Sequence, residues 1–123
     1  MSKRILVIDD EPLIVDLLTH LLSRFDYQAD QASHHQEALE KLSHIPFDAI
    51  FLDMRMPDID GKEFYLQIRK RFPHLAERVV FVTGDIANPE TMSFVRETGN
   101  LYLEKPFTMR SVKDLLEKYF QTG

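Results

Sequence analysis

The sequence contains no cysteine, so this chain has neither disulfides nor thiolate metal ligands. It also lacks an apolar run of membrane-spanning length. The apolar core of its first residues, MSKRILVIDD, is far too short for a signal peptide. These absences predict a cytoplasmic protein that makes no membrane contact of its own.

Basic residues are in the minority, with 15 Lys and Arg against 20 Asp and Glu, and the net charge is -5. A general electrostatic attraction to nucleic acid or to an anionic membrane is therefore not expected. The 123 residues, 44% of them hydrophobic, suit one domain with a sizeable core and leave no room for a second. Without a repeat, low-complexity segment or linker, we expect one domain over residues 1–123.

Two periodicities alternate along the chain. Short continuous apolar runs are typical of strands covered on both faces, and they lie at residues 5–8, 49–52 and 79–82, with weaker candidates at 27–32 and 101–103. Helical stripes separate and follow these runs, at residues 13–25, 38–42, 64–72, 92–95 and 112–120. Five β-α units with short connections predict a doubly wound α/β fold, with a parallel sheet and helices on both faces.

Polar residues follow the strands at the sheet edge where such folds bind ligands. Asp9 and Asp10 end the first run, Asp53 ends the run at 49–52, Thr83 ends the run at 79–82, and Lys105 follows the last. Converging carboxylates raise each other's pKa unless a cation lies between them. Mg²⁺ prefers carboxylate and carbonyl oxygens and needs no cysteine or histidine cluster. The three acids therefore predict a magnesium site.

Thr83 and Lys105 add groups that bind anions. Lys105 supplies a point positive charge and Thr83 a hydroxyl donor, and together with the metal they suit a phosphoryl group. One carboxylate is then free to act as a nucleophile. Asp53 is the candidate, because it ends the middle apolar run, between the acidic pair and the Thr and Lys residues.

The stretches DDEP, LDMRMPDIDG, VTGD and YLEKPF bring five chemically distinct positions to the strand ends in a fixed order. In this the chain resembles the receiver domain of two-component response regulators, from about residue 3 to residue 119. The resemblance implies a flavodoxin-like, five-stranded parallel sheet in the order 2-1-3-4-5. It also implies a receiver domain without an output domain.

The resemblance carries roles to individual residues. Asp10 corresponds to the direct Mg²⁺ ligand, Asp9 to an acid that often binds through water, and Asp53 to the phosphorylated residue. The remaining protein ligand is the backbone carbonyl two residues beyond the phosphoacceptor, here that of Arg55. Lys105 corresponds to the phosphate-binding lysine, before a peptide bond to Pro106 that is typically cis.

The mechanism implied is in-line attack by Asp53 on a phosphohistidine of a histidine kinase or histidine phosphotransfer domain. Hydrolysis of the acyl phosphate later resets the domain, so we do not expect a conventional enzyme. The resemblance makes Thr83 and Tyr102 the two switch residues. Partners would then contact the fourth helix, fifth strand and fifth helix, and dimerisation through that face is left open.

Arg55 and Asp85 occupy two variable family positions, two residues beyond the phosphoacceptor and two beyond the switch hydroxyl. Their charges are opposite. We hypothesise that they pair across the mouth of the site and hinder the attacking water, which would lengthen the phosphorylated state.

Other classes of protein also place an acid at a strand end. A phosphatase of the haloacid dehalogenase type needs a general acid two residues after its nucleophile, where this chain has Arg55. A flavodoxin-like cofactor binder needs a small-residue anion cradle, and DDEP would repel a phosphate. An interaction module that is never phosphorylated remains the third alternative. It would leave Asp9 and Asp10 as helix caps, Thr83 as a strand residue and Lys105 as a surface lysine.

Several polar residues are interpreted as structural. Asp58 and Asp60 belong to the loop MRMPDIDG, where Asp60 is expected to cap the next helix. The five histidines are scattered, apart from the adjacent His34 and His35, and are expected to be solvated.

The stretches VTGD and TGNLYLEKPF also resemble receivers at the C-terminus of hybrid histidine kinases, which we therefore favour as the parent protein.

Overall fold

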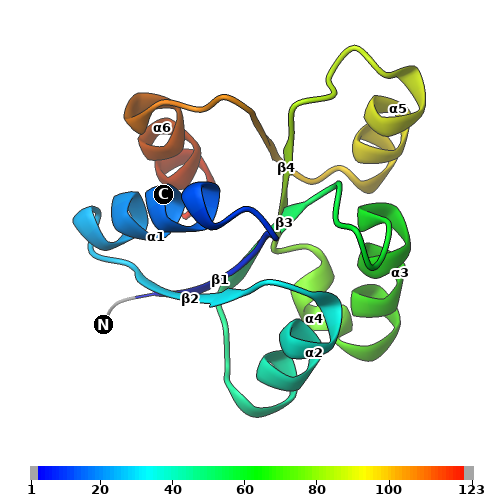
Figure 1. Cartoon of the computed structure of the whole chain (residues 1–123), viewed down its shortest axis with the longest axis horizontal. Helices are drawn as coiled ribbons and strands as arrows, with labels where there is room; N and C mark the ends of the chain where they lie inside the picture. Colours follow the sequence, from blue (N-terminus) through cyan, green and yellow to red (C-terminus); the bar gives the residue numbers. More distant parts are fainter. Residues whose placement is uncertain (1–2, 121–123) are drawn as a thin grey trace.

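The computed structural model describes residues 3–120, and five parallel strands form the centre of the fold (Figure 1). Their order in the sheet is β2-β1-β3-β4-β5, as expected. The strands are β1 (Arg4–Ile8), β2 (Gln28–Ala32), β3 (Ala49–Asp53), β4 (Val79–Thr83) and β5 (Tyr102–Glu104). The predicted α/β fold and strand order are confirmed.

The structure contains one helix more than the periodicity predicted. The helices are α1 (Pro12–Arg24), α2 (His35–His44), α3 (Gly61–Arg71), α4 (Pro73–Ala76), α5 (Pro89–Thr98) and α6 (Met109–Tyr119). The additional α4 is a single turn that starts at Pro73, and one turn is too short to show a 3.6-residue period. The expected fourth and fifth helices are therefore α5 and α6.

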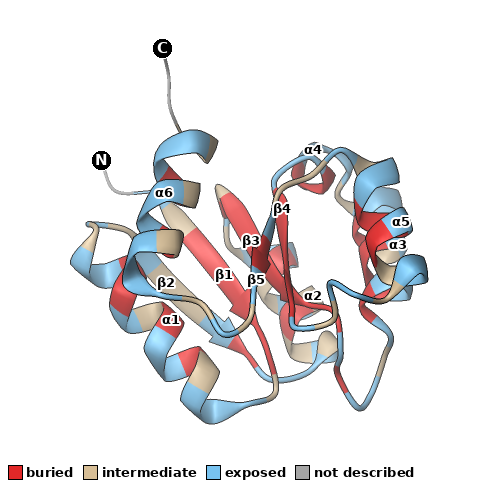
Figure 2. Ribbon diagram, turned by 90° about the horizontal axis from the view of Figure 1, so that it is seen from above, coloured by how far each residue is buried: buried red, intermediate tan, exposed pale blue. Residues whose placement is uncertain are grey.

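Helices cover both faces of the sheet in an unequal division (Figures 1 and 2). Helices α1 and α6 pack on one face, while α2, α3, α4 and α5 pack on the other. Every residue of β3 and β4 is buried, which explains their continuous apolar sequences. Strand β2 lies at an edge and is mostly polar, which explains its weak signal. None of the helices between residues 3 and 120 combines the length and hydropathy of a membrane span.

The register of the strands aligns their carboxyl ends. Ile8 of β1 lies beside Leu52 of β3, and Asp53 lies beside Val82 of β4. Thr83 in turn lies beside Glu104 of β5. The residues that end or follow these strands therefore reach one edge of the sheet, which positions the candidate site.

The loop after β3 folds back on itself before α3 begins. Arg55 and Asp60 form an isolated antiparallel bridge, and the Gly61 N–H donates to the Met54 carbonyl at 3.1 Å. A Cβ at Gly61 would lie 2.6 Å from Met54 Cα and 2.9 Å from its carbonyl oxygen. This close approach of the two backbone segments requires glycine at position 61. As expected, the Asp60 side chain caps α3 by accepting from the Lys62 N–H.

We predict that Gly61→Ala destabilises the domain by about 1 to 3 kcal/mol, because the new methyl group meets backbone that cannot move aside. Urea unfolding followed by circular dichroism measures the loss. Gly99→Asn is the control: Gly99 has a φ of 74° and open space around it, and Asn tolerates that conformation. Equal unfolding midpoints for Gly61→Ala and the wild type would contradict the proposed close approach.

Candidate functional site

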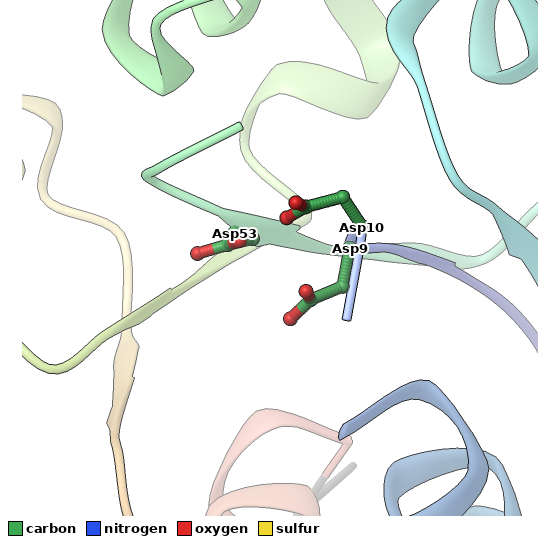
Figure 3. A group of neighbouring side chains, drawn as sticks. All are labelled: Asp9, Asp10 and Asp53. Atoms are coloured by element: carbon green, nitrogen blue, oxygen red, sulfur yellow. The ribbon is translucent and has the colours of Figure 1, made fainter. Parts of the chain in front are cut away.

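Three carboxylates meet beyond the ends of β1 and β3. Figure 3 shows Asp9 and Asp10, which follow β1, beside Asp53 at the end of β3. One oxygen from each carboxylate lies within 4.8 Å of the other two. Asp9 and Asp53 are buried, at 2% and 3% exposure, whereas Asp10 is more accessible. The structure therefore brings together the three acids that the sequence placed at these strand ends.

Each buried carboxylate has one oxygen bound to the backbone and one without a hydrogen bond. Asp9 Oδ1 accepts from the Glu11 N–H at 2.9 Å, and Asp53 Oδ1 accepts from the Arg55 N–H at 3.2 Å. The Oδ2 atoms of Asp9 and Asp53 are buried and have no hydrogen-bond partner among the described residues. Buried anionic oxygens without partners are costly. Their arrangement fits a hard divalent cation that takes oxygen ligands.

Lys105 partly compensates this negative charge. Its Nζ lies 3.2 Å from Asp9 Oδ2, and the two groups form an ion pair without the alignment of a hydrogen bond. The same Nζ lies 3.4 Å from both Asp53 Oδ1 and Glu11 Oε1. Burial alone would lower the pKa of Lys105, but the charges of Asp53 and Asp9 raise it above its ordinary value. The lysine is therefore a fixed cation at the site. The bond from Lys105 to Pro106 is cis, as the resemblance implied.

Asp53 holds a proton more tightly than an ordinary aspartate. Burial, followed by the charge of Asp9, raises the pKa of Asp53 to about 6, although the Arg55 N–H and Lys105 oppose the shift. A bound cation would favour the ionised carboxylate. Proton and metal therefore compete for the same oxygens.

Thr83 and Lys105 line the same cavity as Asp53. The cavity has a volume of about 260 Å³, and Gly84, Arg55, Asp85 and Glu11 form the rest of its lining. Thr83 is buried, and its Oγ1 accepts from the Asp85 N–H at 3.0 Å. The Lys105 N–H donates to the Thr83 carbonyl at 2.8 Å. The cavity thus combines a carboxylate, a hydroxyl and an ammonium group, which suits a phosphoryl group.

Arg55 and Asp85 form the contact that their charges suggested. Arg55 Nη2 lies 2.9 Å from Asp85 Oδ2, so the pair joins the loop after β3 to the loop after β4. The Arg55 side chain is 79% exposed, so solvent screens the pair. Tyr102, the other predicted switch residue, is 43% exposed on the edge strand β5. Its phenol ring therefore lies outside the core.

Three contacts at or near the site were missed in the sequence. Glu11 reaches Lys105, whereas its sequence position suggested only a helix start. The capping role suggested for Asp9 or Asp10 is wrong, because α1 has Glu11 at its N-cap position and no side-chain cap. Asp9 instead accepts from the Glu11 N–H.

His35, expected to be solvated, binds Asp58 of the loop after β3. No sequence signal reveals this last contact, because 23 residues separate the partners.

Comparisons with known proteins identify the family and the fold of this chain. The model of the response regulator receiver domain matches residues 5–117. Transcriptional regulatory protein ResD of Bacillus subtilis is 38% identical over 128 residues, 99% of this chain and 51% of the relative. Sporulation initiation phosphotransferase F of the same organism is 30% identical over 122 residues, 97% of this chain and 94% of that protein. The crystal structure of response regulator protein TrrA from Thermotoga maritima in complex with Mg²⁺-BeF has a TM-score of 0.82 and 32% identity, covering 97% of this chain and all of that one.

A parallel sheet in the order β2-β1-β3-β4-β5, with its candidate site beyond the carboxyl ends of the strands, is the flavodoxin-like doubly wound architecture. The chain belongs to the family of response regulator receiver domains, which act in two-component and phosphorelay signal transduction. This assignment replaces the phosphatase and cofactor-binder alternatives. The chain spans about half the length of the first two curated relatives, 51% and 46%.

We predict that Asp53→Asn stabilises the metal-free protein at pH 7.5 by about 1 to 3 kcal/mol. The folded wild type keeps the Asp53 proton up to about pH 6, whereas the unfolded chain releases it near its ordinary value of 3.8. The stability of the wild type therefore falls as the pH rises through this window, and the amide removes that loss.

Urea unfolding in EDTA at pH 4 and pH 7.5 measures both proteins. The advantage of the variant should be much smaller at pH 4, where the folded protein keeps the Asp53 proton and the unfolded chain has released only part of it. Glu40→Gln, which neutralises an exposed acid of α2, serves as the control for a general charge effect. An advantage of equal size at both pH values would be inconsistent with a raised pKa of Asp53.

Proposed function

We propose that Asp53 accepts a phosphoryl group from a phosphohistidine of a histidine kinase or histidine phosphotransfer domain, with Mg²⁺ bound beside it. The observation that carries the proposal is the buried Asp53 carboxylate: one of its oxygens has no hydrogen-bond partner in the part of the chain that the structure describes, and Lys105 Nζ lies 3.4 Å from the other. Asp10, Asp53 and the Arg55 carbonyl would hold the metal, and Asp9 would bind through water. TrrA, whose solved complex contains Mg²⁺-BeF, supports the choice of metal.

In the proposed reaction, a free oxygen of Asp53 forms a bond to phosphorus while the bond between phosphorus and the imidazole nitrogen breaks. The electron pair of the broken bond stays on the imidazole. Bound Mg²⁺ supplies charge neutralisation for the phosphoryl oxygens. Lys105 donates to one of these oxygens, and the Thr83 hydroxyl to another. Water later cleaves the acyl phosphate, so the domain promotes only its own modification and reset and is not a conventional enzyme.

Signal output in this proposal starts at Thr83. When its hydroxyl turns to the phosphoryl group, Tyr102 moves from its exposed position towards the space that Thr83 leaves. The surface formed by α5, β5 and α6 then changes and contacts a downstream partner or a second copy of the domain. We further propose that residues 1–123 act as a cytoplasmic receiver unit without direct nucleic-acid or membrane contact. A hybrid histidine kinase as the parent stays a prediction.

Incubation with acetyl phosphate tests the proposed chemistry. Intact-protein mass spectrometry should show the gain of one phosphoryl group in the presence of Mg²⁺ and none in EDTA, because the uncompensated carboxylates repel the anionic donor. Asp53→Asn should gain none, since an amide oxygen is a poor nucleophile. The same variant, if folded by circular dichroism, also controls for modification at other acids.

A wild type that gains no phosphoryl group from acetyl phosphate or from a phosphorylated histidine donor would overturn the proposal. That outcome would favour a receiver-shaped interaction module that works without phosphorylation. Modification of Asp53→Asn to the wild-type extent would instead move the phosphoacceptor to another residue.

We predict that Asp85→Ala shortens the phosphorylated state by at most about fivefold, because an exposed ion pair is worth less than about 1 kcal/mol. The Arg55–Asp85 pair lies at the mouth of the cavity, where its loss would admit the attacking water. Loss of radiolabel from the phosphorylated protein gives the rate. Asp114→Ala, which removes the exposed Arg110–Asp114 pair of α6, is the matched control. An unchanged or slower rate in Asp85→Ala would reject this role.

A further inference from the structure

The loop after β3 is attached to α2 by a contact outside the phosphorylation cavity. Asp58 Oδ2 accepts from the backbone N–H of His35 at 2.9 Å and lies at hydrogen-bond distance from Nδ1 of the same residue. His35 is the first residue of α2, where backbone N–H groups have no partner within the helix. Asp58 therefore satisfies one of these groups and adds a negative charge where the helix dipole favours it.

The His35 ring is held on a second side. It meets the Phe64 ring of α3 edge-on, with 6.1 Å between the ring centroids. Burial alone would raise the pKa of Asp58, but the hydrogen bonds from the His35 backbone and ring lower it below its ordinary value. The contact thus joins an ionised carboxylate to a ring that is fixed between α2 and α3.

The two adjacent histidines have different bonding roles. His34 is the N-cap residue of α2, and its Nδ1 accepts from the Glu37 N–H at 3.2 Å. The ring of His35 instead faces a carboxylate oxygen, which only accepts, so its Nδ1 carries a proton. Helix α2 therefore keeps its own cap when the His35 ring is removed.

Asp58 lies three positions after Arg55, and the backbone of Arg55 is central to the candidate site. The Arg55 N–H donates to Asp53, and its carbonyl is the metal ligand in the proposed function. The intervening loop is closed by the bridge between Arg55 and Asp60 and by the hydrogen bond from Gly61 to Met54. A displacement of Asp58 is therefore passed on to Arg55 within one short, closed loop.

Two side-chain contacts join this loop to more distant elements. Arg55 contacts Asp85, which lies two residues after Thr83, the proposed switch residue. Asp58 contacts His35 on α2, away from Thr83. The second contact does not depend on Thr83, so together with the bonds that close the loop it helps to hold the Arg55 carbonyl in place.

We propose that His35 is a positioning residue for the metal site: through Asp58 it fixes the loop whose Arg55 carbonyl binds Mg²⁺. The inference rests on the proposed function. Removal of the ring lowers the affinity for Mg²⁺ and leaves the chemistry at Asp53 intact, because no atom of His35 lines the phosphorylation cavity.

The test compares the wild type with His35→Ala, His35→Asn and Asp58→Ala. An asparagine amide nitrogen occupies nearly the position of histidine Nδ1 and restores the donor. Calorimetric titration with Mg²⁺ gives the affinity without any phosphodonor. Phosphorylation by acetyl phosphate over a range of Mg²⁺ concentrations gives the half-saturating concentration and the maximal rate separately.

His35→Ala and Asp58→Ala should weaken Mg²⁺ binding between about twofold and tenfold, the range expected for one partly exposed hydrogen bond. The half-saturating Mg²⁺ concentration should rise by the same factor, while the maximal rate stays within about twofold of the wild type. His35→Asn should recover most of the affinity. The double variant should lose no more than the larger of the two single losses, because both substitutions break one contact.

His44→Ala is the matched control, since it removes another histidine of α2, one whose Nδ1 lies 2.8 Å from the Glu40 carbonyl of the same helix. An affinity for Mg²⁺ that is equal in the wild type, His35→Ala and Asp58→Ala would overturn the inference while the proposed function stands. A wild type that neither binds Mg²⁺ nor gains a phosphoryl group would overturn both. If His35→Ala fails to fold by circular dichroism, Asp58→Ala decides the question through the same titrations.

Discussion

Repulsion among three carboxylates at one edge of the sheet is the constraint on which the rest of the site depends. Two of them, Asp9 and Asp53, are buried, and within residues 3–120 each has an oxygen without a hydrogen-bond partner. The fold tolerates this cost because Lys105 and two backbone N–H groups offset part of the charge. In the proposed function, the remaining negative charge gives the cavity its affinity for a cation and, with the cation bound, for a phosphoryl group.

The same constraint also explains where apolar and polar residues lie along the chain. Continuous apolar strands bury the centre of the sheet, so polar side chains near the site are confined to the strand ends and the loops that follow them. Those loops are short and held by side-chain contacts such as Arg55–Asp85 and His35–Asp58. In our proposal, the His35–Asp58 contact helps to position the Arg55 carbonyl although neither side chain lines the cavity.

Much of this arrangement follows from periodicity and from the place of each acid in the chain. Periodicity predicted the five strands, and because parallel strands end at one edge it also predicted that their terminal residues meet, namely Asp9, Asp10, Asp53, Thr83 and Lys105. The strand order was implied by the resemblance to receiver domains. Helix α4 was missed because one turn has no period. The Glu11–Lys105 and His35–Asp58 contacts were missed because side-chain reach between loops depends on tertiary packing and leaves no local pattern.

Residue 55 combines two separable tasks. Its backbone lies next to Asp53, to which the N–H donates, while its side chain extends to Asp85. A carbonyl oxygen is the same in every amino acid, so substitution at this position leaves the proposed metal ligand chemically unchanged. In the proposed function, the duration of a signal can therefore be adjusted at residue 55 through the side chain, while the ligand itself is kept.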